Sequence, residues 1–200
     1  MTNTLHYSPE NKIMDPTKNT LFAGVPLVFL RSLPILTISF SGLRRIGFLV
    51  LDRKYRVRVS RSLYLRHLDS AERRLDLARK VIEEIMQQFS IHLVVIDSIG
   101  SRQKVFQGLR NIIQAICESE GAWRREMSSH QVVEQFGGGD RDFTLTELAV
   151  CYPELSKFLD FGKKKFFRNR DHEREMRPLV NAFLLGHAVR LELEQKVKVQ

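Results

Sequence analysis

A continuous apolar run between two helix-like segments constrains the fold of this chain more than any other feature. The run is His92-Leu-Val-Val-Ile-Asp97, and it ends in an acidic residue. A strand without polar alternation is typical of the centre of a sheet that is covered on both faces. Apolar residues recur every three or four positions from Leu75 to Phe89 and again from Val105 to Ile116, which predicts an amphipathic helix on each side of the run. This alternation predicts a layered α/β domain.

Three short segments rich in β-branched residues precede this unit and predict an antiparallel meander. Residues 35–39 and 46–51 are compact apolar runs, and residues 55–60 alternate between apolar or aromatic and basic or polar side chains. Residues 63–65 continue the meander, and Trp123–Met127 is expected to add a further strand. The expected order is therefore three antiparallel strands, helix, strand, helix, strand and then helices.

Local signals also predict where helices begin and end. Asp69 and Glu72 have the spacing of a capping box, which is expected to open the first long helix. Residues 129–136 predict a short helix after the last strand. The chain is expected to end in a helix from about Pro178 to Gln195.

The two ends of the chain differ in pattern. Residues 1–33 are predicted to form an N-terminal arm that is partly disordered, because its first part is polar and irregular. The apolar stretch at residues 21–30 is expected to pack on the body as a strand or arm. Residues 34–200 are expected to form the domain itself.

Charge and cysteine content limit the partners and the compartment. The chain carries 32 Lys and Arg against 23 Asp and Glu, a net charge of +9, which favours a polyanionic partner. The longest apolar stretch, residues 21–30, is shorter than the roughly 20 residues that a membrane span needs, so no membrane association is expected. Cys117 and Cys151 have no metal-site spacing and are expected to be buried free thiols. A cytoplasmic location is predicted, with a nucleoid, organelle stroma or matrix left open.

A basic run with two aromatic residues is the strongest nucleic-acid signal. Lysines and arginines there would neutralise phosphates, while the phenylalanines would contact bases or sugars; the alternative is a solvated loop whose phenylalanines anchor it to the core. The residues expected to bind nucleic acid are Lys163, Lys164, Lys165, Phe166, Phe167, Arg168 and Arg170, extended by Arg44, Arg45, Arg56, Arg58, Arg102 and Lys104.

Several segments together resemble the RuvC-type Holliday-junction resolvases of the RNase H-like superfamily. Residues 35–48 resemble the opening strand and glycine turn of that family. Val94-Val-Ile-Asp97, followed by Gly100, resembles the strand that ends in its second catalytic acid. Residues 181–188 resemble the closing helix that carries the remaining acids, and the resemblance spans roughly residues 35–190.

This resemblance implies a mixed central sheet with a C-terminal helix, metal-dependent phosphodiester cleavage and often a homodimer. Such chemistry requires several carboxylates around one or two Mg²⁺ or Mn²⁺ ions. The first-strand acid position falls on Ser39, the helix position falls on Asn181, and only Asp97 is acidic. One carboxylate with neutral oxygens binds a hard divalent ion weakly, so the family's catalytic set is expected to be degenerate.

Two interpretations of the acidic residues stay open. Asp171 or Glu175 could join Asp97 in a rearranged catalytic site, with Asp97 as a metal ligand. Alternatively, Asp171, Glu173 and Glu175 form a solvated patch that stabilises the start of the C-terminal helix through its dipole. Separately, the alternative to a metal-ligand role for Asp97 is that it caps the helix that follows its strand.

The function expected first is that of a RuvC-like protein that binds branched or structured nucleic acid with little or no cleavage, DNA being favoured over RNA. One alternative is a Mg²⁺-dependent endonuclease of the RuvC type with a rearranged acidic site. Another is a structural RNase H-like module in a larger complex. A Mg²⁺ or Mn²⁺ cofactor is expected only if the chain is active, and a homodimer is the expected assembly.

Overall fold

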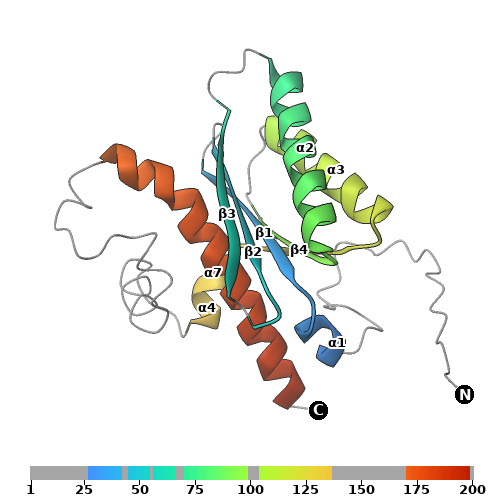
Figure 1. Ribbon diagram of the computed structural model, residues 1–200. Helices are drawn as coiled ribbons and strands as arrows, with labels where there is room; N and C mark the ends of the chain where they lie inside the picture. The colour runs from blue at the N-terminus through green and yellow to red at the C-terminus, as the bar shows by residue number, and fades with distance from the viewer. Residues whose placement is uncertain are drawn as a thin grey trace, which may run out of the picture.

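A computed structural model shows a central sheet with helices on both of its faces (Figure 1). The structure describes residues 27–41, 45–54, 56–65, 70–98, 104–136 and 170–198. The long helix α7 and the short α4 lie on one face, while α2 and α3 cover the other. This arrangement confirms the predicted α/β fold class.

The sheet has five strands in the order β3-β2-β1-β4-β5. The pairs β1/β2 and β2/β3 are antiparallel, while β1/β4 and β4/β5 are parallel. The predicted meander followed by parallel strands is therefore confirmed. The strands are β1 (Ile35–Ser41), β2 (Arg45–Leu51), β3 (Val57–Tyr64), β4 (Leu93–Asp97) and β5 (Trp123–Met127).

Three expectations about the helices are corrected. The end of the stretch expected to pack as a strand or arm forms a short helix, not a strand. The side chain of Ser70, rather than Asp69, caps α2 by accepting a hydrogen bond from the Arg73 backbone N–H. The last helix begins at Arg170 and contains Pro178 internally; the fixed φ of proline suits a helix, but inside one it removes a hydrogen bond and crowds the carbonyl group four residues earlier. The described helices are α1 (Leu27–Arg31), α2 (Ala71–Phe89), α3 (Lys104–Ser119), α4 (Ser129–Gln135) and α7 (Arg170–Lys198).

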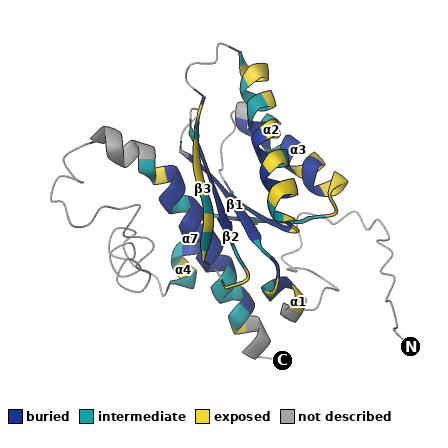
Figure 2. Ribbon diagram, viewed as in Figure 1, coloured by how far each residue is buried: buried dark blue, intermediate teal, exposed yellow. Residues whose placement is uncertain are grey.

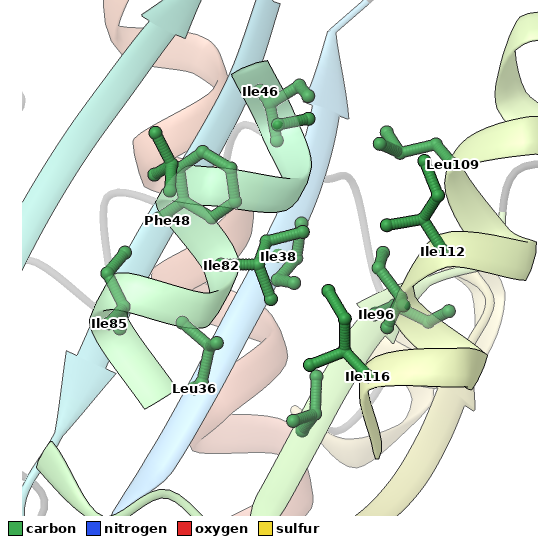
Figure 3. Close-up of a cluster of buried hydrophobic side chains, with 14 of the residues drawn as sticks. Leu36, Ile38, Ile46, Phe48, Ile82, Ile85, Ile96, Leu109, Ile112 and Ile116 are labelled. Carbon is green, nitrogen blue, oxygen red and sulfur yellow. The ribbon is translucent and has the colours of Figure 1, made fainter. Parts of the chain in front are cut away.

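The sheet separates two apolar clusters, because alternate residues of a strand point to opposite faces. On β1, Leu36 and Ile38 belong to the cluster between the sheet and helices α2 and α3, which Figure 3 shows. Ile35 belongs to the cluster between the sheet and α7, called the α7 cluster below. All five residues of β4 are buried, as expected for a central strand. The dark blue central part of α7 in Figure 2 consists of the buried residues with which this helix covers the α7 cluster.

The N-terminal arm is described only at its end. Leu30 and Leu33 are buried in the α7 cluster, so this part of the predicted arm packs against the sheet. The predicted disorder of the first residues lies outside the described ranges.

Two further expectations concern thiols and membranes. Cys117 is a buried free thiol, as predicted, and Cys151 lies outside the described residues. Among the helices that the structure describes, none combines the length and the apolar character that crossing a membrane requires.

Candidate functional site

The site lies at the carboxyl ends of β1 and β4, which meet at the same edge of the sheet because the two strands are parallel neighbours. Ile38 pairs with Ile96, so the next residues, Ser39 and Asp97, are also neighbours. Crevices outside the carboxyl ends of parallel strands are where ligands bind in open α/β sheets.

Ser39 and Asp97 belong to the sheet face that α7 covers. Ile35 lies four positions before Ser39, Val95 lies two positions before Asp97, and both pack in the α7 cluster. Period-two alternation therefore places Ser39 and Asp97 on that same face. Both side chains are buried, Ser39 fully and Asp97 with 9% of its surface exposed. The strands thus present one hydroxyl and one carboxylate toward the last helix.

Helix α7 brings Asn181 to the same place. Asp97 and Asn181 line one small cavity of about 10 Å³, together with Ser129, and a cavity of this size holds roughly one water molecule. The remaining wall is apolar and comes from Val132, Val133, Phe136, Leu184 and Leu185. Asp97 and Asn181, far apart in sequence, therefore share one cavity.

A close backbone contact sets the height of α7 above this site. Gly47 is the antiparallel partner of Ser39. A Cβ at Gly47 would lie 2.5 Å from the carbonyl carbon and oxygen of Pro178, well inside van der Waals contact. The absence of a side chain at Gly47 lets α7 approach the end of β1, with Asn181 one turn further along.

The hydroxyl of Ser39 is an unusual feature of the site. Its oxygen is buried, and within the described part of the chain it has no hydrogen-bond partner. By contrast, the hydroxyl of Thr37 on the same strand donates to the carbonyl of Leu49 at 3.2 Å. A buried hydroxyl without a partner costs free energy, which marks Ser39 as a position where a solvent molecule or ligand atom would be stabilised.

The described side chains do not fit a two-metal centre. Ser39, Asp97 and Asn181 supply a single negative charge, and among the described residues no three His, Cys, Asp or Glu side chains are grouped to hold a metal ion. Mg²⁺ sites of nucleases rely on several carboxylates.

The other acidic positions are placed only by their backbone. Residues 171–175 form the first turns of α7, but their side chains lie outside the described part. Both a rearranged site with Asp171 or Glu175 and a dipole-stabilising patch that includes Glu173 therefore remain predictions. Asp97 is not the N-cap residue of α3, because that helix begins at Lys104.

One predicted basic residue lies at this end of the sheet. Arg45 opens β2 opposite Ser41, and its guanidinium lies 5.0 Å from the ring centre of Tyr64 on β3. Tyr64 is 38% exposed, and the sequence analysis does not single it out. A cation stacked on an exposed ring is suited to contact with a phosphate and a base. Tyr64 could have been identified from the sequence only by pairing residues 45–51 with residues 57–64, which places it opposite Arg45.

Two other basic residues lie at the wrong end. Arg56 and Arg58 form ion pairs with Asp52, which follows the last residue of β2. Because β2 runs antiparallel to β1, this is the edge opposite Asp97. Arg56 and Arg58 therefore do not extend a basic face at the Asp97 edge, whereas residues 163–169, around which that face is predicted, are not described. Residues 163–169, Arg44 and Arg102 lie outside the described ranges, as do the side chains of Lys104 and Arg170.

The fold can be compared with solved structures. The structure of Thermus thermophilus RuvC in complex with a Holliday-junction substrate matches with a TM-score of 0.59 and 13% identity, covering 82% of this chain and 96% of that chain. The chain has an RNase H-like fold similar to that of RuvC. A second structure of Thermus thermophilus RuvC matches with a TM-score of 0.57 and 14% identity, covering 79% and 93% of the two chains.

Comparisons of sequence do not assign this chain to a family. No family model matches it, and no curated protein matches it. The similarity therefore lies in the arrangement of the strands and helices.

Proposed function

We propose that this RuvC-like chain binds branched or structured nucleic acid at the carboxyl ends of β1 and β4 and does not cleave it. The RuvC structure that it resembles is a complex with a Holliday-junction substrate. The net charge of +9 suits a polyanion. Arg45 and Tyr64 supply a cation and an exposed ring at the same edge.

The observation that carries the absence of cleavage is the grouping of Ser39 and Asn181 around Asp97. The sheet and α7 bring these three positions together, yet two of them are neutral. A site with one carboxylate has lost most of the charge that would hold divalent ions. The proposed function is therefore recognition.

A second candidate is an endonuclease with a rearranged acidic site. The observation that favours it is the early start of α7, which makes Asp171 and Glu175 part of the helix that carries Asn181. In that case Asp97 and these acids would hold Mg²⁺ or Mn²⁺, and the ions would activate the attacking water.

The two candidates separate in a gel-shift and cleavage assay. Labelled four-way junction, duplex and single strand are each incubated with Mg²⁺, Mn²⁺ or EDTA, using the wild type and Asp97→Asn. We expect junction binding that weakens steeply with salt, no cleavage with either metal, and equal binding by the variant. Metal-dependent cleavage that Asp97→Asn abolishes would establish the endonuclease. No binding to any substrate at moderate salt would leave the structural module.

Charge variants locate the interface. Replacing Lys163, Lys164 and Lys165 with alanine is expected to weaken junction binding and to lower the salt slope by about one for each phosphate that is no longer neutralised. The matched control replaces three exposed cations of α2, on the opposite sheet face: Arg73, Arg79 and Lys80. If both triple variants weaken binding equally, the charge acts without a defined interface.

The finer features of this proposal need separate measurements. We propose DNA rather than RNA as the partner, a homodimer as the assembly and a cytoplasmic, nucleoid or organellar location. An RNA junction of the same sequence tests the first, sedimentation of the protein with and without DNA tests the second, and imaging of a tagged chain tests the third.

A further inference from the structure

A second concave site lies at the opposite edge of the sheet from Asp97. Its volume is about 490 Å³, within the size range of pockets for small ligands. It is formed where β2 ends and β3 begins, next to the end of α2 and the residues just before β1 and β4. Strand β1 separates the two sites by roughly 20 Å, the length of a seven-residue strand.

Asp52 organises the basic side of this pocket. Its Oδ2 accepts from Nε of Arg56 at 2.9 Å and lies 3.0 Å from Nε of Arg58. Its Oδ1 accepts from the backbone N–H groups of Lys54 at 2.8 Å and of Arg56 at 2.9 Å. One carboxylate thus orients two guanidinium groups, that of Arg56 just before β3 and that of Arg58 within β3.

The charge of Asp52 is secured by these contacts. Burial alone would raise the pKa of its carboxyl group, but the hydrogen bonds from Arg56 and Lys54 and the positive charge of Arg56 outweigh it and lower the pKa. Asp52 is therefore ionised at neutral pH. Its single negative charge is shared by two arginines and leaves each with unused donors.

The pocket has a surplus of positive charge. Arg53 and Lys54 also line it, both are exposed, and within the described residues the side chain of neither forms an ion pair. Four cationic side chains therefore surround one carboxylate. A planar guanidinium fork held in place is well suited to the oxygens of a phosphate group.

Part of the pocket wall is apolar. Phe89, partly buried at the end of α2, lines the pocket together with Leu33, Pro34 and Val50. A ligand made only of phosphate would leave this wall unused. An aromatic ring next to a cationic rim matches a molecule with a flat base and a phosphate.

We propose that this pocket binds a nucleoside phosphate, with the phosphate on Arg53, Lys54, Arg56 and Arg58 and the base against Phe89. The ligand is either a free nucleotide or the phosphorylated end of a nucleic-acid strand, since both present the same group. The pocket is distinct from the Asp97 site, and its occupancy does not depend on the function proposed for that site.

Calorimetric titration of the full-length chain tests this assignment. The probes are AMP, adenosine, inorganic phosphate, and a short single strand with and without a terminal phosphate. We expect AMP to bind about tenfold or more tightly than adenosine or phosphate alone. If the phosphorylated strand binds more tightly than AMP, the ligand of the pocket is a strand end. If AMP binds more tightly, the ligand is a free nucleotide. If neither AMP nor the phosphorylated strand binds, the proposal is overturned.

Two variants assign the contacts. Arg53→Gln/Lys54→Gln changes only exposed side chains and is expected to weaken AMP binding about tenfold, while Arg79→Gln/Lys80→Gln on α2 removes the same charge and leaves AMP binding unchanged. Phe89→Leu is expected to weaken the binding of AMP but not of inorganic phosphate. Equal effects of the two charge variants, or none from the first, would overturn the assignment. Junction binding is measured on the same proteins, so that failure of this pocket is distinguished from failure of the Asp97 site.

Discussion

Gly47 of β2 lies directly against the backbone of Pro178 in α7. A Cβ at Gly47 would stand 2.5 Å from the carbonyl group of Pro178 and 2.9 Å from the nitrogen of Leu179. Since Gly47 pairs with Ser39, this contact decides how closely α7 covers the end of β1. It therefore controls the position of Asn181 relative to Asp97.

Gly47→Ala is expected to destabilise the protein by about 1–3 kcal/mol, because α7 must move away from the sheet. Chemical denaturation measures this loss. Gly108→Ala in α3 is the control: its new methyl group would meet the flexible end of Leu75 at 2.9 Å, and alanine favours the helix. Equal stability of Gly47→Ala and wild type would contradict the close approach described above.

Restoring carboxylates should create a metal site. In Ser39→Asp/Asn181→Asp, one new acid would stand beside Asp97 on the neighbouring strand and the other across the cavity from it, so we expect a lower melting temperature in EDTA and a clear rise with Mn²⁺. The wild type should respond much less. The same double variant carrying Asp97→Asn is the control and should lose most of the metal response. A response that does not depend on residue 97 would show that the ion binds elsewhere.

His187 predicts a specific pH dependence of stability. Burial, reinforced by the positive charge of Arg190, lowers the pKa of this imidazole from 6.5 to about 4, and its ring lies 4.2 Å from that of Phe183. Below pH 6.5 His187 is protonated in the unfolded chain but stays neutral in the folded chain. Up to about 3 kcal/mol of the free energy of unfolding is therefore lost as the pH falls toward 4.

Chemical denaturation of the wild type and of His187→Leu between pH 6.5 and 4 measures the effect. The free energy of unfolding is plotted against pH for each protein, and the two slopes are compared. The variant should show the flatter profile. Asp52 interferes little, because its pKa is lowered: its stabilising contribution is present above its ordinary pKa of 3.8 and is lost only as the pH falls through and below that value. Parallel profiles for both proteins would contradict a neutral buried His187.

Cys117 is expected to be inert in the folded protein. Burial raises the pKa of its thiol to about 12, so very little reactive thiolate is present at neutral pH. In a Cys151→Ser background, a thiol reagent should modify Cys117 only after denaturant is added. Rapid reaction of the native protein would contradict its burial.

Local sequence patterns are sufficient for the sheet and most helices. The unbroken run that ends at Asp97 and the period-two pattern of residues 57–60 follow directly from which faces of each strand are buried. The ends of helices are less predictable. Pro178 suggests a helix start, yet it lies inside a helix that begins at Arg170, with its backbone close to Gly47.

By itself, the sequence determined the layered α/β class, the buried central strand and the absence of acids at residues 39 and 181, because each depends only on residue type and local periodicity. Tertiary structure alone decided which distant residues meet at the site. The pairing of β2 with β3 places Arg45 over Tyr64, the parallel pairing of β1 with β4 sets Ser39 beside Asp97, and α7 brings Asn181 to the same cavity as Asp97. Such contacts join residues through the direction of neighbouring strands, which no local pattern encodes.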